Sequence, residues 1–153
     1  MRFLEHKIPP PIVALLCALL IWWLGKRTPA LNLPNSVRIG AAIALLAAGI
    51  FVMLAAVISF RRAKTTVNPL KPETASALVT SGIFGYTRNP MYLGMLLVLC
   101  AWVAFLASPA ALTVVLVFWL YIGHFQIRPE EAALTSLFGG DFTDYTKRVR
   151  RWL

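Results

Sequence analysis

Residues 89–127 form one long run without Asp, Glu, Lys or Arg, and this run restricts the possible fold more than any other feature. As a helix it would be about 58 Å long at a rise of about 1.5 Å per residue, which is close to two crossings of the hydrocarbon core of a bilayer. Ser108-Pro109, near its middle, is a helix-breaking signal. The run therefore predicts two helices, at residues 91–107 and 110–127, that form a tight antiparallel hairpin.

The rest of the chain is also too apolar for a water-soluble domain. Of its 153 residues, 59% are hydrophobic and 14% are charged, whereas soluble domains carry about 25% charged residues. Residues 39–60 are uncharged and long enough to span a membrane. A shorter apolar stretch follows Pro9-Pro10-Pro11, and proline suits the first turn of a helix. We therefore predict an all-α integral membrane helical bundle with four transmembrane helices, at residues 9–25, 39–60, 91–107 and 110–127.

The remaining segments complete a single domain over residues 1–153. The loop at 61–90 is rich in proline and apolar residues, so we expect it to be folded rather than a linker. The tail at 129–152 is predicted to form two short helices, the first beginning near Pro129 and ending at Gly139-Gly140. The second would have an apolar face, made of Phe142, Tyr145 and Val149. This face would lie against the membrane or over the loop.

Basic residues set the predicted orientation. Lys and Arg are concentrated in the loop at 61–90 and in the tail, whereas the turn at Ser108-Pro109 has none. By the positive-inside rule these two segments and both termini lie in the cytoplasm. Anionic lipid headgroups then account for the net charge of +9, and a lipid bilayer is the expected partner. No nucleic acid is expected as a partner, because no basic stripe lies on a polar fold.

The two cysteines, Cys17 and Cys100, both lie inside apolar runs. They have no spaced partners, so they indicate neither a disulfide framework nor a zinc site. We expect small buried side chains in helices and no metal.

The predicted hairpin brings two polar segments together. Because its outer turn is short, the other ends of its helices meet at the cytoplasmic face, and residues 85–92 are expected beside residues 124–131. The first segment contains Tyr86, Arg88, Asn89, Pro90 and Tyr92, and the second contains His124, Glu130 and Glu131.

Each of these residues has a simple interpretation beside a functional one. Arg88 could be an anchor on the cytoplasmic side, or it could bind an anion together with the free N–H groups of the helix that begins after it. Glu130 and Glu131 could cap a helix, or one of them could face a cationic ligand in a partly desolvated pocket. His124 could be an interfacial residue or a catalytic one. These residue types alone are compatible with several reactions.

Two sequence motifs resemble those of a known family. LVTSGIFGYTRNPMYLG at residues 78–94 and EEAALTSLFGGDFTDYTKRV at residues 130–149 resemble the two signatures of the isoprenylcysteine carboxyl methyltransferase and phospholipid methyltransferase family. TTVNP at residues 65–69 resembles its lead-in, so that the similarity covers residues 65–152. The resemblance implies an integral membrane methyltransferase that uses S-adenosyl-L-methionine without a Rossmann domain.

The same resemblance implies where the site lies. It places the cofactor on the cytoplasmic side, between the two motifs, and assigns its binding to Tyr86, Arg88, Asn89, Pro90, Tyr92, Gly94, Glu130, Glu131, Tyr145 and Arg148. Arg88, Glu131 and His124 are the candidates for a catalytic role. Catalysis would rest mainly on positioning and exclusion of water. A general base, supplied by His124 or a glutamate, is needed only when the acceptor carries a proton.

Three positions depart from the pattern of the family. Asn89 stands where many members have histidine, Phe142 where tyrosine is frequent and Arg150 where proline is frequent. The first variant resembles that of bacterial members of the family and leaves open the role that the histidine has elsewhere; the expected location is a bacterial inner membrane, although the sequence does not name the organism. The other two remove a hydroxyl and alter the end of the tail.

The expected function is methyl transfer from S-adenosylmethionine to a lipophilic or membrane-associated acceptor. The acceptor could be an isoprenylcysteine-like carboxylate, a lipid amine or a small thiol, and the sequence leaves this choice and the oligomeric state open. One alternative is an NADPH-dependent membrane reductase of the sterol-reductase type, although such enzymes are usually longer. Another is a non-enzymatic small membrane subunit or transporter, which the absence of charge inside the predicted spans disfavours.

Overall fold

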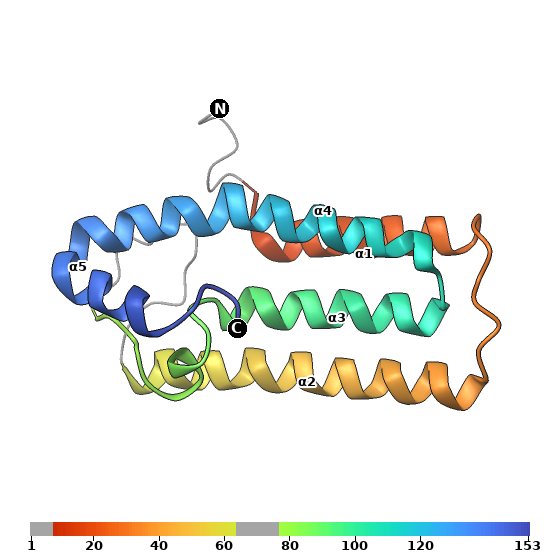
Figure 1. Ribbon diagram of the computed structural model, residues 1–153, viewed down its shortest axis with the longest axis horizontal. Coiled ribbons are helices and arrows are strands. Elements are labelled where there is room, and N and C mark those ends of the chain that lie inside the picture. The colour runs from red at the N-terminus through yellow and green to blue at the C-terminus, as the bar shows by residue number, and fades with distance from the viewer. Residues whose placement is uncertain (1–7, 64–76) are drawn as a thin grey trace.

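A computed structural model describes residues 8–63 and 77–153. In the described part of the chain every regular element is a helix. The elements are α1 (Pro10–Gly25), α2 (Asn35–Arg62), η3 (Gly82–Gly85), α3 (Pro90–Leu106), η4 (Pro109–Ala111), α4 (Leu112–Ile122), η5 (Gly123–Ile127) and α5 (Arg128–Arg148). Figure 1 shows α1 to α4 lying roughly along one direction, with α3 between α2 and the pair formed by α1 and α4. The predicted lead-in at residues 65–69 lies outside the described residues.

The predicted hairpin is confirmed. α3 ends at Leu106 and is capped by Ala107, whose φ of 50° is in the left-handed region. α4 follows after the one-turn helix η4, which begins at Pro109. The outer turn is tied to the loop after α1, because the Leu31 amide donates to the Ala107 carbonyl at 2.8 Å. Ser108 is buried there, and its hydroxyl lies 2.9 Å from that of Thr28. The turn therefore brings α3 and α4 side by side and closes one end of the bundle.

A close contact between two glycines joins α2 to α3. A Cβ added at Gly49 would lie 2.8 Å from the Gly94 carbonyl oxygen, and one added at Gly94 would lie 2.3 Å from Met53 Cγ. The missing side chains let the two backbones approach, as small residues do at helix interfaces in membranes. The contact sets the position of the N-terminal half of α3 relative to α2.

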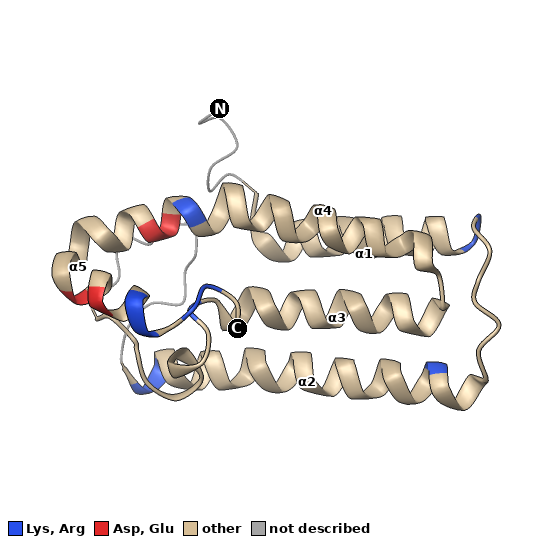
Figure 2. Cartoon of the chain, in the orientation of Figure 1, with Lys and Arg blue, Asp and Glu red and all other residues tan. Residues whose placement is uncertain are grey.

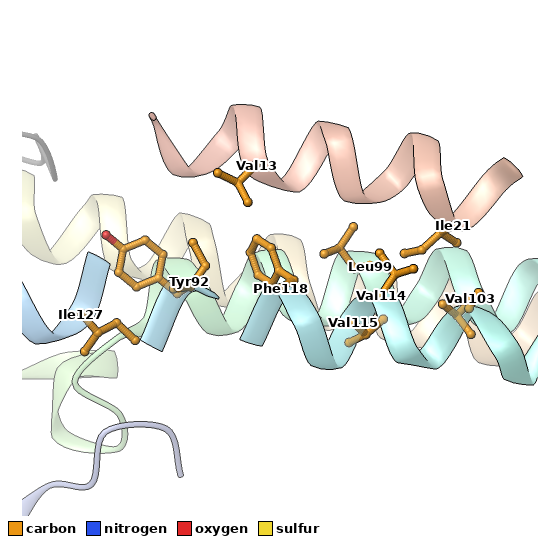
Figure 3. Packing of buried hydrophobic residues seen from close by; sticks show 11 residues of the cluster. Val13, Ile21, Tyr92, Leu99, Val103, Val114, Val115, Phe118 and Ile127 are labelled. Carbon is orange, nitrogen blue, oxygen red and sulfur yellow. The ribbon is translucent and has the colours of Figure 1, made fainter. Parts of the chain in front are cut away.

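The core of the bundle lies between α1, α3 and α4 (Figure 3). Ile21, Leu99 and Phe118 are almost completely buried, with exposures of 0%, 2% and 0%. Tyr92 and Ile127 extend the same cluster to the end at which α5 begins. The outer faces are apolar too: Leu15 and Phe51 are 61% and 67% exposed. Apolar residues on both sides of a helix suit a hydrocarbon surrounding.

Two helical segments are long and apolar enough to cross a membrane. They are Asn35–Arg62 and Pro109–Arg148, whereas Pro10–Gly25 and Pro90–Leu106 are apolar but shorter. Figure 2 shows the charged residues of the described part of the chain near the two ends of the bundle, with Asp and Glu on α5. The all-helical fold is thus confirmed, and the number of membrane crossings stays a prediction.

The predicted break between the fourth span and the tail is wrong. α4 continues through the π-helical turn η5 into α5, with no interruption at Pro129. Proline inside an α-helix normally clashes with the carbonyl four residues earlier, and here that carbonyl belongs to Phe125, which lies in η5. We attribute the continuity to the wider π-turn, which relieves this clash.

The second predicted break, at Gly139-Gly140, is confirmed. Gly139 has φ 50° and ψ −116°, so that α5 is two helical segments joined by a kink. Figure 1 shows the second segment turned back toward the bundle. Phe142, Tyr145 and Val149 form a buried cluster with Leu78 and other residues. The apolar face of the tail therefore lies over the loop before α3.

Candidate functional site

A cavity of about 130 Å³ lies at the end of the bundle at which α5 folds back. Its walls come from the C-terminal end of α2, the segment before α3, and α5. The apolar wall consists of Phe60, Ala77, Leu78, Val79, Phe84, Leu134 and Phe142. The polar wall consists of Arg88, Asn89, Glu130, Glu131 and Tyr145. The cavity thus has an apolar wall facing a short row of charged and hydroxyl groups.

A tight turn positions Arg88 directly before α3. Thr87 is completely buried, and its hydroxyl accepts a hydrogen bond from the Asn89 amide at 3.2 Å. Asn89 has ψ 54° and is followed by Pro90, the first residue of α3. Proline suits the first turn of a helix, and it disfavours helical backbone angles in the residue before it, so the helix begins at Pro90. The turn leaves the Arg88 side chain only 12% exposed at the cavity wall.

Arg88 belongs to an ionic cluster with two other residues. Its Nη2 lies 2.9 Å from Glu131 Oε1. The Glu131 carboxylate also accepts two bonds from Arg151, from Nε at 3.2 Å and from Nη2 at 2.5 Å. A two-pronged arginine–carboxylate contact fixes the orientation of both groups. The cluster holds two cations and one anion, so it has a surplus of positive charge next to the cavity.

One donor of Arg88 remains available. Its Nε is buried and has no hydrogen-bond partner in the described part of the chain. A buried N–H without a partner costs about 1–3 kcal/mol, so such a group marks a place at which a ligand would be favourable. An anionic acceptor of a hydrogen bond, such as a carboxylate, fits this donor best.

Glu130 has a different environment from its neighbour. The Tyr92 hydroxyl donates a hydrogen bond to Glu130 Oε1. Glu130 lies three residues beyond the uncharged run that ends at Ile127, and so outside the predicted span. Burial raises the pKa of its carboxyl to about 8. The hydrogen bond from Tyr92 lowers this pKa, and the charge of Glu131 raises it further. Adjacent carboxyls with different surroundings can hold different protonation states near neutral pH.

Aromatic side chains close the other side of the cavity. Tyr145 is 3% exposed, and its hydroxyl donates to the Phe84 carbonyl at 2.7 Å. Burial raises the pKa of this phenol to about 12, against a lowering by Arg88, so it stays a neutral donor. Phe84 also packs edge-to-face on Phe60, with ring centroids 4.9 Å apart. Phe142, which stands where tyrosine is frequent in the family that the motifs resemble, is buried in the same wall.

The structure brings together much of the predicted site. Arg88, Asn89, Glu130, Glu131 and Tyr145 line the cavity, and the two predicted polar segments meet through the contacts of Arg88 with Glu131 and of Tyr92 with Glu130. Pro90 is buried at the start of α3.

Four predicted residues lie elsewhere. Tyr86 is 76% exposed, and Gly94 lies against α2 at the glycine contact. His124 is exposed, with its Nδ1 3.1 Å from an Arg128 nitrogen. Arg148 is exposed and donates to the Asp144 carbonyl at 3.4 Å. None of these four residues lines the cavity, and their roles in binding or catalysis stay predictions.

The sequence reasoning missed Arg151 and the apolar wall. Arg151 was counted only as one of several basic residues of the tail, and nothing in the local pattern separates it from Arg150 or Arg148. The wall residue Phe142 had a signal, since it shares a face with Tyr145 and Val149 at helical spacing. Among the described residues no group of three or more His, Cys, Asp or Glu is arranged to hold a metal.

Comparisons with known proteins agree with the motifs. The model of a family described as phospholipid methyltransferase matches residues 37–141. An uncharacterized protein of Haemophilus influenzae is 46% identical over 63 residues, which are 41% of this chain and all of that protein. The protein-S-isoprenylcysteine O-methyltransferase of Schizosaccharomyces pombe is 28% identical over 120 residues, 78% of this chain. The match covers about half (50%) of the length of that yeast protein. No solved structure gives a significant match.

Proposed function

Because the chain belongs to the phospholipid methyltransferase family, we propose that it transfers a methyl group from S-adenosylmethionine to a lipophilic acceptor at the face of a membrane. The observation that carries this proposal is a cavity lined by both Arg88, whose buried Nε has no partner among the described residues, and aromatic side chains. Family membership supports methyl transfer as the reaction. The donor, the membrane face and the acceptor are the parts that we propose.

The residues of the cavity fit the groups of S-adenosylmethionine. The unpartnered Nε of Arg88 suits its carboxylate, and Phe84, Phe142 and Tyr145 offer apolar and aromatic surface for its adenine. The side-chain oxygens of Asn89 and Glu130 could accept hydrogen bonds from its amine. When bound, this cofactor supplies an activated methyl group. The chain then has to hold it, orient the acceptor and exclude water.

The proposed location is the cytoplasmic face of a bacterial inner membrane. Two apolar helices of sufficient length and the apolar outer faces of the bundle support a membrane protein. The cavity lies where the described basic residues of the tail gather, which is the face that the positive-inside rule assigns to the cytoplasm. A lipophilic acceptor would approach such a site from the bilayer.

The charge of the cluster favours an anionic acceptor among those considered. Arg88 and Arg151 outnumber Glu131, and a surplus cation near the cavity attracts a carboxylate more than an amine. The yeast relative is by its name an O-methyltransferase of isoprenylcysteine. We therefore propose a prenylated thioether carboxylate as the first acceptor to test, ahead of a lipid amine. A carboxylate needs no general base, since it is already ionised at neutral pH.

Calorimetry on the detergent-purified protein tests the cofactor. S-adenosylhomocysteine is titrated in one experiment and NADPH in a parallel one. Saturable binding of the first alone supports the proposal. Binding of NADPH alone would replace it with a reductase, and binding of neither would favour a non-enzymatic membrane subunit.

Transfer of a labelled methyl group tests the acceptor. The protein in lipid vesicles is given labelled S-adenosylmethionine with either a farnesylated cysteine derivative or phosphatidylethanolamine. We expect label in the farnesylated compound, in a base-labile ester. Label in the phospholipid amine instead would overturn the choice of acceptor and leave the proposed reaction in place.

A further inference from the structure

The last residues of the chain run back along the site. We call residues 149–153, which follow α5, the C-terminal strap. Val149 leaves the helix with extended backbone angles, φ −122° and ψ 131°. The strap then passes beside the turn that carries Arg88, and Figure 1 shows the C-terminus lying near the start of α3. None of the motifs discussed above assigns a role to the strap beyond Val149.

Three hydrogen bonds join the strap to the turn before α3. The Arg88 amide donates to the Arg150 carbonyl at 3.1 Å. The Arg151 carbonyl accepts from Asn89 Nδ2 at 2.9 Å and from the Thr87 hydroxyl at 3.4 Å. Thr87 and Asn89 are buried, with exposures of 0% and 8%, so these contacts lie inside the molecule. The turn that aims Arg88 is therefore held by the strap as much as by α3.

The side chain of Arg151 approaches the site from the outside. It is 37% exposed, whereas Glu131 is 19% and Arg88 12% exposed. Both of its bonds go to Glu131, and Arg151 is not among the residues that line the cavity. Its hydrogen bonds therefore reach the cavity through Glu131, which in turn pairs with Arg88.

Glu131 needs a second partner to keep its orientation. Its Oε1 is shared between Arg88 and Arg151, and its Oε2 is bonded to Arg151. Without Arg151, the carboxylate keeps one single-pronged contact and can rotate toward solvent. Arg88 would then lose the geometry that directs its free Nε.

Trp152 anchors the strap to the bundle. Its ring lies 6.2 Å from that of Trp119 on α4, centroid to centroid, and it packs against the main core cluster. The strap thus connects α4 with the turn before α3 and with α5, and the last two line the cavity.

We propose that Arg151 is a positioning residue of the site, which holds Glu131 in the orientation that pairs it with Arg88. This inference rests on the proposed function, because the ligand whose binding it supports is S-adenosylmethionine. It goes beyond that function by giving the C-terminal end a defined role.

The test measures binding of S-adenosylhomocysteine to the full-length protein in detergent. Arg151→Gln is expected to lower the affinity about tenfold, which corresponds to about 1.4 kcal/mol. Arg151→Lys restores the charge without the two-pronged fork, and we expect it to recover only part of the loss. The matched control is Arg150→Gln, which removes the same charge from the neighbouring residue and keeps its backbone carbonyl; its affinity should stay within about twofold of wild type.

A double-mutant cycle with Glu131→Gln separates positioning from a general structural effect. If Arg151 acts through Glu131, Arg151→Gln will have almost no further effect on affinity once Glu131 has been replaced. Additive losses in the double variant, or wild-type affinity in Arg151→Gln, would overturn the inference while leaving the proposed function intact. No binding by the wild-type protein would overturn both.

Discussion

Two arginines lie at opposite ends of α3 and have opposite kinds of partner. Arg38 lies at the C-terminal end, where its Nη2 and Nε donate to the Phe105 carbonyl at 2.6 and 3.2 Å. Arg88 lies just before the N-terminal end, where it pairs with Glu131. The C-terminal end of a helix carries partial negative charge and the N-terminal end partial positive charge.

The difference shows which arginine needs an explanation. Although Arg38 lies near the N-terminus of its own helix α2, its bonds to the Phe105 carbonyl at the end of α3 account for its position. Arg88 lies just before the N-terminus of α3, where the helix dipole disfavours a cation, and its side chain is also largely buried. The cation is retained there with the help of the Glu131 carboxylate, and its Nε has no partner within residues 8–63 and 77–153. Such an arrangement costs stability and is typical of a binding site.

Among the variants that test this difference between the two arginines, the largest change in ligand affinity is expected at Arg88. Arg88→Ala removes the cavity donor and leaves the Glu131 carboxylate with Arg151 alone. A lost hydrogen bond between a charged group and its ligand costs about 1.5–3 kcal/mol, so we expect binding of S-adenosylhomocysteine to weaken by up to about 100-fold, with near-normal expression. Glu131→Ala should weaken it similarly.

Arg38→Ala is the matched control for that experiment. It removes an arginine of the same helix pair at the other end, so affinity should be unchanged. Calorimetry on both variants decides the comparison. Equal affinities for the Arg88 and Arg38 variants would remove the distinction between the two ends and the site assignment with it.

The next largest effect is expected on stability, at the glycine contact. Gly94→Ala places a methyl group 2.3 Å from Met53 Cγ and 2.8 Å from the Gly49 carbonyl oxygen, and such overpacking typically costs about 1–3 kcal/mol. The thermal unfolding midpoint in detergent should fall. Gly40→Ala in α2 is the control, since nothing lies within 4 Å of its added Cβ; replacing a helical glycine by alanine adds up to about 1 kcal/mol. A Gly94→Ala midpoint at or above that of wild type would contradict the packing role.

A smaller effect should appear in the dependence of stability on pH. Because burial raises the pKa of Glu130 from 4.5 to about 8, the folded protein holds this proton more tightly than the unfolded chain does. The contribution of Glu130 to the free energy of unfolding is therefore greatest below about pH 4.5 and is lost as the pH rises through about 8. Unfolding midpoints of wild type and Glu130→Gln, compared between about pH 5 and 8, should diverge because the variant lacks this decline. Parallel curves would mean that Glu130 is not buried as described.

The smallest effect is expected at His124. This residue is exposed and bonded to Arg128, outside the wall of the cavity. We expect His124→Ala to change the rate of methyl transfer by no more than about twofold, since general base catalysis contributes about 100-fold or more where it operates. A loss of that larger size, measured with saturating acceptor, would restore His124 as the base.

Much of the candidate site could be predicted because a hairpin leaves little freedom. Once residues 89–127 form two antiparallel helices, Arg88 and Glu131 must lie at the same end. The contacts between individual residues of different helices could not be predicted in this way. Gly94 belongs to a motif that the resemblance assigns to the cofactor site, yet in the structure it packs against α2. The sequence of one helix does not show which residue lies opposite it in a neighbouring helix. The continuity of α4 and α5 was missed because a π-turn has no reliable sequence signal.

Local sequence patterns were sufficient to predict the helical architecture, the outer turn at Ser108-Pro109, the kink at Gly139 and the apolar face of the tail. These features follow from hydrophobic periodicity, from the fixed backbone angle of proline and from the conformational freedom of glycine. The contact of Arg151 with Glu131, which no neighbouring arginine of the tail makes among the described residues, could be identified only from the folded chain. A long side chain finds its partner through the path of the backbone, and that path is set by the kink at Gly139 and by contacts such as that of Trp152 with Trp119.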